Sequence, residues 1–102
     1  MSDQIYSIDD IKSIMNRIMK KVPVKRVTLF GSYANKTANK KSDLDLVIDS
    51  NGQIMGFALF SLIDEIENSF QKQVDAFEKC EIIENSKIDK EIKKNGVIVY
   101  EK

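Results

Sequence analysis

The chain lacks the residues that thiol and histidine catalysis require. Its 102 residues include one cysteine, Cys80, and no histidine. One cysteine cannot form an internal disulfide, so the fold does not depend on oxidation. Without histidine, a Cys–His catalytic pair is excluded. We therefore interpret Cys80 as an ordinary thiol.

A dominant charge and a long apolar run are missing as well. Sixteen basic residues balance sixteen acidic ones, which gives no overall bias toward nucleic acid or anionic membranes. The longest apolar run, residues 54–60, is interrupted by Gly56 and is far shorter than the roughly 20 residues of a membrane span. Residues 1–4 lack a signal-peptide pattern. These features predict a cytoplasmic protein that neither crosses a membrane nor binds a specific nucleic-acid sequence.

The length predicts one domain over residues 1–102 with a modest core. Helical spacing of apolar residues, with capping and stop signals, predicts helices over residues 8–21, 59–70 and 86–94. β-Branched and apolar stretches predict strands over residues 27–30, 44–48, 73–77 and 97–100. Residues 82–83 fit either an extension of the third strand or a separate short segment. This order predicts an α/β (α+β) domain with helices packed on a small mixed sheet.

Asp43 and Asp45 stand two positions apart at the start of the second predicted strand. Side chains two apart on a strand point to the same face, so both carboxylates project together while Leu44 and Leu46 face the core. Two like charges side by side cost free energy unless a cation lies between them. Mg²⁺ prefers one or two carboxylates together with substrate phosphates. The pair predicts a magnesium site, with a solvated strand edge as the alternative.

Gly31 and Ser32 directly follow the first predicted strand and precede a short predicted helix at residues 32–34. Glycine lets phosphate oxygens approach the backbone closely. The following amides and the Ser32 hydroxyl can form an anion site. No Gly-Lys-Ser/Thr follows, so this is not a Walker-type loop. We interpret the pair as phosphate ligands, with a simple turn and a capping serine as the alternative.

Asp75 lies inside the third predicted strand. If that strand neighbours the one bearing Asp43 and Asp45, three carboxylates converge. Three carboxylates can hold two metal ions, which stabilise the attacking and leaving oxygens in phosphoryl or nucleotidyl transfer. Asp75 can also accept the proton of an attacking hydroxyl. An exposed charge on an edge strand is the alternative.

The remaining acidic residues are interpreted without a catalytic role. Asp49 continues the face of Asp45 but lies at the strand end near a turn, so we read it as structural. Asp64, Glu65 and Glu67 fall on the polar side of the second predicted helix, which predicts a solvated face.

The combination of Phe30-Gly31-Ser32, ten further residues and then Asp43-Leu44-Asp45-Leu46 resembles the signature of the nucleotidyltransferase superfamily that includes DNA polymerase β. It most resembles the minimal, single-domain (MNT) branch, and the likeness covers nearly the whole chain. The resemblance implies a nucleotidyltransferase fold that binds ATP or another nucleoside triphosphate. It further implies Gly31 and Ser32 as nucleotide-binding residues, and Asp43, Asp45 and Asp75 as catalytic residues that hold one or two Mg²⁺ ions.

The chain departs from this branch at one place. The branch commonly has Arg-Gly where this chain has Asn35-Lys36. Lys36, Lys40 or Lys41 could replace the lost charge, but only as a point charge without the bidentate fork of arginine. We take Lys36 as the nucleotide-binding substitute, with a solvated lysine loop as the alternative.

Members of the MNT branch are typically bacterial or archaeal and are often paired with a helical HEPN-type protein, as antitoxin to toxin. Some transfer AMP from ATP onto a tyrosine of that partner. The resemblance therefore implies an adenylyltransferase that modifies a partner protein. A non-catalytic antitoxin module and an antibiotic-modifying nucleotidyltransferase are the alternatives, although the latter usually carries an extra domain for the drug. The sequence leaves a homo-oligomer and a hetero-oligomer open.

Overall fold

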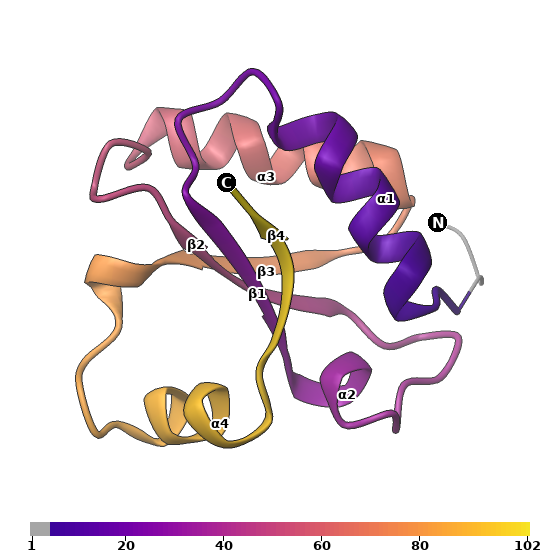
Figure 1. The fold of residues 1–102 in the computed structure, drawn as a ribbon. Helices are drawn as coiled ribbons and strands as arrows, with labels where there is room; N and C mark the ends of the chain where they lie inside the picture. The colour runs from indigo at the N-terminus through magenta and orange to yellow at the C-terminus, as the bar shows by residue number, and fades with distance from the viewer. Residues whose placement is uncertain (1–4) are drawn as a thin grey trace.

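A computed structural model describes residues 5–102 as a four-stranded sheet with helices on both faces (Figure 1). The start at residues 1–4, read above for a signal peptide, lies outside the described residues. The predicted fold class, a small mixed sheet with packed helices, is confirmed. The elements in chain order are α1 (Ile8–Met19), β1 (Arg26–Phe30), α2 (Gly31–Ala34), β2 (Leu44–Asp49), α3 (Phe57–Phe70), β3 (Val74–Glu78), the 3₁₀ turn η1 (Lys79–Glu81), α4 (Lys87–Asn95) and β4 (Val97–Glu101).

The sheet has the strand order β3-β2-β1-β4. β1 pairs antiparallel with both β2 and β4, whereas β2 and β3 run parallel. Parallel neighbours require a crossover connection, and α3 provides it here. In Figure 1, α1 and α3 cover one face of the sheet, and α2 and α4 lie on the opposite side. Each face of the sheet therefore carries two helices.

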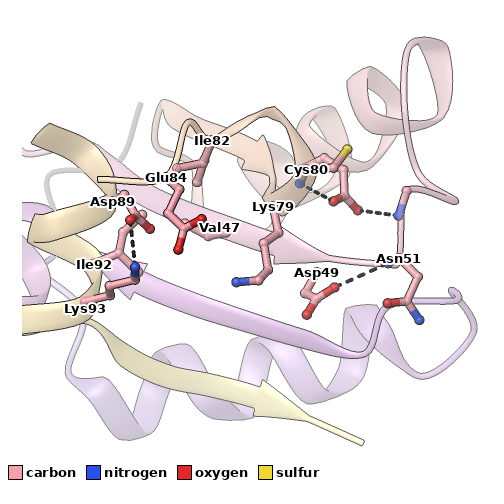
Figure 2. A pocket seen from close by; sticks show the side chains of 12 residues that line it. Val47, Asp49, Asn51, Lys79, Cys80, Ile82, Glu84, Asp89, Ile92 and Lys93 are labelled. Atoms are coloured by element: carbon pink, nitrogen blue, oxygen red, sulfur yellow. Dashed lines mark hydrogen bonds and ion pairs between the residues drawn. The ribbon is translucent and has the colours of Figure 1, made fainter. Parts of the chain in front are cut away.

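Alternation along β2 divides its side chains between these two faces. Leu44, Leu46 and Ile48 are fully buried members of the main core cluster, which also includes residues of α1 and α3. Asp45, Val47 and Asp49 consequently project from the other face, because successive strand residues point in opposite directions. Asp49 also shapes the turn after β2, since its Oδ1 accepts a hydrogen bond from the Asn51 backbone N–H (3.3 Å; Figure 2). This contact agrees with its structural interpretation.

The helix and strand boundaries differ slightly from the sequence prediction. The Ser7–Asp10 capping box is confirmed, but α1 ends at Met19 rather than at residue 21. The residue before Pro23 is disfavoured in a helix, and a turn forms there instead. The third strand is shifted by one residue to Val74–Glu78. Residues 82–83 belong to no strand, because the chain turns through η1 directly after β3.

The prediction of a solvated Glu67 is wrong. Its Oε2 accepts a hydrogen bond from the Val74 backbone N–H at 2.9 Å. The short connection between α3 and β3 brings the last turn of the helix back beside the start of the strand. Glu67 therefore fixes the beginning of β3, whereas Asp64 and Glu65 are exposed as predicted.

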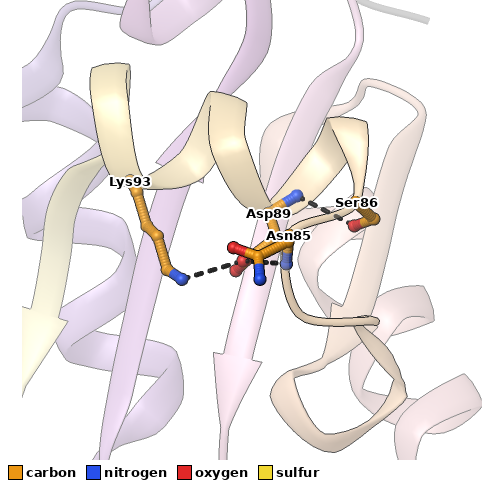
Figure 3. A network of polar contacts seen from close by, with 4 residues as sticks. All are labelled: Asn85, Ser86, Asp89 and Lys93. Atoms are coloured by element: carbon orange, nitrogen blue, oxygen red, sulfur yellow. Dashed lines mark hydrogen bonds and ion pairs between the residues drawn. The ribbon is translucent and has the colours of Figure 1, made fainter.

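Polar contacts define the start of α4 (Figure 3). Ser86 is the N-cap, and its hydroxyl accepts a hydrogen bond from the Asp89 backbone N–H (3.2 Å). The Asp89 carboxylate accepts from the Asn85 backbone N–H (2.8 Å) and pairs with Lys93 (2.9 Å). At the other end, Gly96 stops the helix as predicted, but not through a left-handed conformation. A Cβ there would overlap the Ile92 carbonyl, so glycine is needed for close packing.

Glu78 is a buried carboxylate at the end of β3 and is only 1% exposed. It accepts hydrogen bonds from the backbone N–H and hydroxyl of Ser50 and from the backbone N–H groups of Gly52 and Cys80. Burial alone would raise its pKa, but these hydrogen bonds outweigh burial and lower the pKa below the ordinary value. The ionised carboxylate therefore joins the turn after β2 to the end of β3.

We expect Glu78→Gln to destabilise the protein at pH 7 by about 2–3 kcal/mol, because the amide nitrogen would face backbone donors. The native pKa is depressed, so this carboxylate contributes stability above pH 4–5 that is lost as the pH falls through the lower native value. The difference in the free energy of unfolding between wild type and variant should therefore become smaller in strong acid. Urea unfolding across the pH range measures it. Glu84→Gln, at an exposed position, is the control. A difference in unfolding free energy between wild type and Glu78→Gln that stays constant with pH would contradict this role of the carboxylate.

Candidate functional site

Two of the three predicted aspartates are direct neighbours in the sheet. Asp45 of β2 and Asp75 of β3 are register partners in the parallel pair, and neighbouring strands lie about 4.8 Å apart. Asp43 lies two residues before Asp45, immediately ahead of β2. The sequence analysis required the strand of Asp75 to lie beside the strand of Asp45, and the structure confirms this. The three carboxylates therefore gather at one end of the β2–β3 pair.

Crowding of these carboxylates changes the acidity of Asp45. Partial burial, followed by the nearby charges of Asp75 and Asp43, raises the pKa of Asp45 to about 6. Like charges in a poorly solvated place disfavour ionisation, and a bound cation would reverse that effect. The site therefore gains stability from any cation that it binds.

The three aspartates offer carboxylate oxygens as ligands for a metal ion. Among residues 5–102, no three His, Cys, Asp or Glu side chains are arranged to hold one ion by themselves. Mg²⁺, however, is commonly held by one or two carboxylates, with water and substrate phosphates completing its coordination. Asp43 and Asp45 fit that donor set, with Asp75 beside them.

Gly31 lies against the Asp45 carboxylate. β1 ends at Phe30, the register partner of Asp45, and Gly31 follows with a positive φ of 73°. A Cβ at Gly31 would overlap the Asp45 carboxylate oxygen. Glycine is therefore required both by the backbone conformation and by the closeness of the carboxylate.

Ser32 is the second residue of the single turn of α2, next to this contact. The N-cap position of α2 is Phe30, and no side chain caps the helix, so Ser32 is not a capping serine. Within the described part of the chain, its hydroxyl has no hydrogen-bond partner. The hydroxyl is thus available beside the Gly31–Asp45 contact.

The three lysines predicted as possible phosphate ligands, Lys36, Lys40 and Lys41, do not share one environment. Lys36 has a positive φ of 60° and borders a cavity of about 270 Å³ together with Tyr6, Ser7 and Tyr33. Lys40 and Lys41 are exposed. No contact described between residues 5 and 102 joins any of the three to Asp43, Asp45 or Asp75. Their part in phosphate binding stays a prediction.

Sequence reasoning missed Lys72, which is only 3% exposed. Its Nζ donates a hydrogen bond to the Lys40 carbonyl at 2.9 Å. This contact ties the residues that lead to Asp43 to the start of β3, where the Leu44 N–H also bonds to the Gln73 carbonyl (3.1 Å). Lysine is rarely buried, and nothing in the local pattern distinguishes this one from a surface lysine.

Gly31→Ala should lower the melting temperature for two separable reasons. The added methyl group meets the Asp45 carboxylate, and alanine resists the positive φ, which together should cost about 2–4 kcal/mol. Removing the carboxylate relieves only the first cost. A double-mutant cycle of Gly31→Ala with Asp45→Ala should therefore show a favourable coupling of at least about 1 kcal/mol.

Gly52→Ala is the matched control for this cycle. Gly52 also has a positive φ, but a Cβ there meets no atom within 4 Å. It should show the conformational cost without coupling to Asp45→Ala. If the effects of Gly31→Ala and Asp45→Ala on the free energy of unfolding are additive, the added methyl group does not contact the Asp45 carboxylate.

Comparisons with known proteins agree with this geometry. Residues 12–102 match the family model described as polymerase beta, nucleotidyltransferase. "Putative protein adenylyltransferase MJ1215" of Methanocaldococcus jannaschii is 28% identical over 86 residues, which cover 80% of this chain and all of that protein. A second protein so described from the same organism, MJ0435, is 33% identical over 69 residues, covering 68% of this chain and 74% of its own length.

Solved structures with the same fold come from toxin–antitoxin complexes. A toxin–antitoxin crystal structure with AMP-PNP aligns with a TM-score of 0.73 at 16% identity, covering 89% of this chain and 73% of the other. A Shewanella oneidensis complex of MNT antitoxin with tri-AMPylated HEPN toxin aligns with a TM-score of 0.65 at 14% identity, covering 90% and 71%. At these identities the likeness establishes the fold. In residues 5–102, none of the helices has the length and apolar character that a membrane crossing requires.

Proposed function

This chain belongs to the polymerase β nucleotidyltransferase family, and we propose that it transfers AMP from ATP to a hydroxyl group of a partner protein. The observation that carries the proposal is the register of the parallel pair, which sets Asp75 beside Asp45 next to the Gly31 turn. The relatives described as protein adenylyltransferases support the choice of AMP and of a protein acceptor.

Each site residue has a stated role in this proposal. Gly31 and Ser32 bind the triphosphate through backbone amides and the free hydroxyl, with Lys36 as a further phosphate ligand. Asp43 and Asp45 hold Mg²⁺, and Asp75 contributes to a second ion. When bound, the metal neutralises phosphate charge and lowers the pKa of the acceptor hydroxyl.

The reaction exchanges one phosphorus–oxygen bond for another. The acceptor oxygen forms a bond to the α-phosphorus, and the bond from that phosphorus to the bridging oxygen of the β-phosphate breaks. Pyrophosphate leaves with the bonding electron pair. Asp75, the most exposed of the three aspartates, receives the proton of the acceptor hydroxyl.

The biological setting follows from the family branch. We propose that the chain acts in the cytoplasm as one domain over residues 1–102 and as the antitoxin of an MNT–HEPN pair. The neighbouring structures in which an MNT antitoxin binds a HEPN toxin, one of them AMPylated, support this partner.

One observation favours a second candidate, a non-catalytic module that neutralises its partner by contact. Asn35-Lys36 replaces the Arg-Gly that is common in the branch, and Lys36 borders a cavity with Tyr6 and Ser7. In that case the carboxylates would bind metal without transferring AMP. The two experiments below distinguish the candidates.

The first experiment tests nucleotide binding. Asp43→Asn combined with Asp45→Asn should abolish MgATP binding in calorimetry, because both carboxylates that hold the nucleotide-bound ion are lost. Ser32→Ala should weaken binding by roughly 1.5–3 kcal/mol through the loss of one hydrogen bond to a charged group. Asp64→Asn together with Glu65→Gln, on the exposed side of α3, is the matched control. Full MgATP affinity in the double asparagine variant would refute the site.

The second experiment tests transfer. Label from α-³²P-ATP should appear on the HEPN-type partner, and label from γ-³²P-ATP should not. Asp75→Asn should abolish labelling but retain much of the MgATP binding, since Asp43 and Asp45 remain. Transfer of the γ label would instead indicate a phosphotransferase. Binding of MgATP without transfer of either label would favour the non-catalytic module.

A further inference from the structure

The outer side of α3 exposes large apolar side chains at its first turn. Phe57 is 93% exposed and Phe60 is 73% exposed, and because they are three residues apart they lie on the same side of the helix. Met55, just before the helix, is 39% exposed, and its carbonyl accepts a hydrogen bond from the Ala58 N–H (3.2 Å). We call Met55, Phe57 and Phe60 the apolar patch.

The core of the protein does not use the apolar patch. The opposite side of α3 supplies the core cluster with Leu59, Leu62, Ile66 and Phe70. A surface helix normally carries polar residues on its outer side. Two phenylalanines exposed on one turn are unfavourable in water, and a contiguous exposed apolar patch is typical of an interaction surface. The patch therefore indicates a binding role for the outer side of α3.

Acidic residues continue the outer side of α3 beyond the apolar patch. Asp64 follows Phe60 by four residues, so it lies on the same side of the helix, and Glu65 is next to it. Both acidic side chains are exposed, and among residues 5–102 neither has an ion-pair partner. The sequence between residues 42 and 71 contains no lysine or arginine. The outer side of α3 is therefore apolar at its start and negatively charged further along.

The size and the charge of this surface distinguish between its possible occupants. A phenylalanine side chain presents on the order of 200 Å², so the apolar patch measures roughly 400 Å². A stable dimer buries about 800 Å² on each partner. A second copy of this chain that paired α3 with α3 would also bring no basic residue of that helix to Asp64 and Glu65. An anionic lipid surface would be repelled by the two carboxylates. One side of a single basic helix fits both the size and the charge.

We propose that the outer side of α3 is a docking surface for an amphipathic, basic helix of a partner protein. Apolar residues of that helix cover Phe57 and Phe60, and a lysine or arginine pairs with Asp64 or Glu65. The two acidic residues lie about 6–12 Å beyond the phenylalanines along α3, because an α-helix rises 1.5 Å per residue. The basic residue of the partner helix therefore stands one or two turns from its apolar residues.

The docking surface and the carboxylate site lie on opposite faces of the sheet. α3 covers the face on which Leu44 and Leu46 are buried (Figure 1), and Asp45 projects from the other face because strand residues alternate. A helix docked on α3 therefore leaves the nucleotide site uncovered. The inference goes beyond the proposed function and does not depend on the transfer of AMP.

The test adds two capped amphipathic peptides separately to the ¹⁵N-labelled protein. One repeats Leu-Lys-Lys-Leu-Leu-Lys-Leu twice, and the other has glutamate in place of every lysine. The lysine peptide should shift the amide signals of α3 and saturate, and the glutamate peptide should bind at least tenfold more weakly. Phe57→Ser combined with Phe60→Ser should weaken binding of the lysine peptide at least tenfold, and Asp64→Lys should weaken it at least threefold.

Two matched variants outside α3 are the controls. Ile83→Ser removes an apolar side chain that is 75% exposed, and Glu84→Lys reverses an exposed charge. Neither should change the affinity for the lysine peptide. The side chains substituted on α3 are exposed, so those variants should keep the melting temperature of the wild type.

Several results would overturn the inference. They are equal binding of both peptides, unchanged binding to the Phe57→Ser and Phe60→Ser double variant, shifts confined to another surface, and no binding at millimolar peptide. A dimer in sedimentation that the same double variant abolishes would assign the surface to a second copy instead. Binding to vesicles of phosphatidylcholine and phosphatidylglycerol that requires the two phenylalanines would assign it to a lipid surface. The double variant should keep the MgATP affinity of the wild type, so failure of the docking surface leaves the proposed function standing.

Discussion

The parallel pairing of β2 with β3 sets the Asp45 and Asp75 carboxylates side by side on one face of the sheet. Partial burial of Asp45, followed by repulsion from Asp75 and Asp43, raises its pKa to about 6, so the fold holds this arrangement against an electrostatic cost. The opposite face of the same strand supplies the compensation, because Leu44, Leu46 and Ile48 are fully buried there. One strand thus carries both the core and the charged site.

Two buried charged side chains form hydrogen bonds to the segments before and after β2. Before the strand, Lys72 bonds to the Lys40 carbonyl, and after it Glu78 collects donors from Ser50 and Gly52. Both side chains come from the segment that contains β3. A buried charge is costly unless it has polar partners, and main-chain groups are among the partners of both side chains. The register of the two strands, and hence the spacing of the aspartates, is therefore held from both ends.

The two faces of the sheet have different roles. α1 and α3 cover one face (Figure 1). The other face carries Asp45 and Asp75 beside the Gly31 turn.

The sequence by itself determined the order of helices and strands and the residue types of the site. Periodicity, the Ser7 cap and the Gly31-Ser32 and Asp43–Asp45 spacings are local signals, and local signals can be read without a fold. Only the tertiary structure decided that β3 lies beside β2 in the register that pairs Asp75 with Asp45. It also revealed the hydrogen bonds of the half-buried Glu67 and of the buried Lys72 and Glu78. Those residues look like surface charges because their partners are main-chain groups brought near by strand pairing and helix packing, which no local pattern encodes.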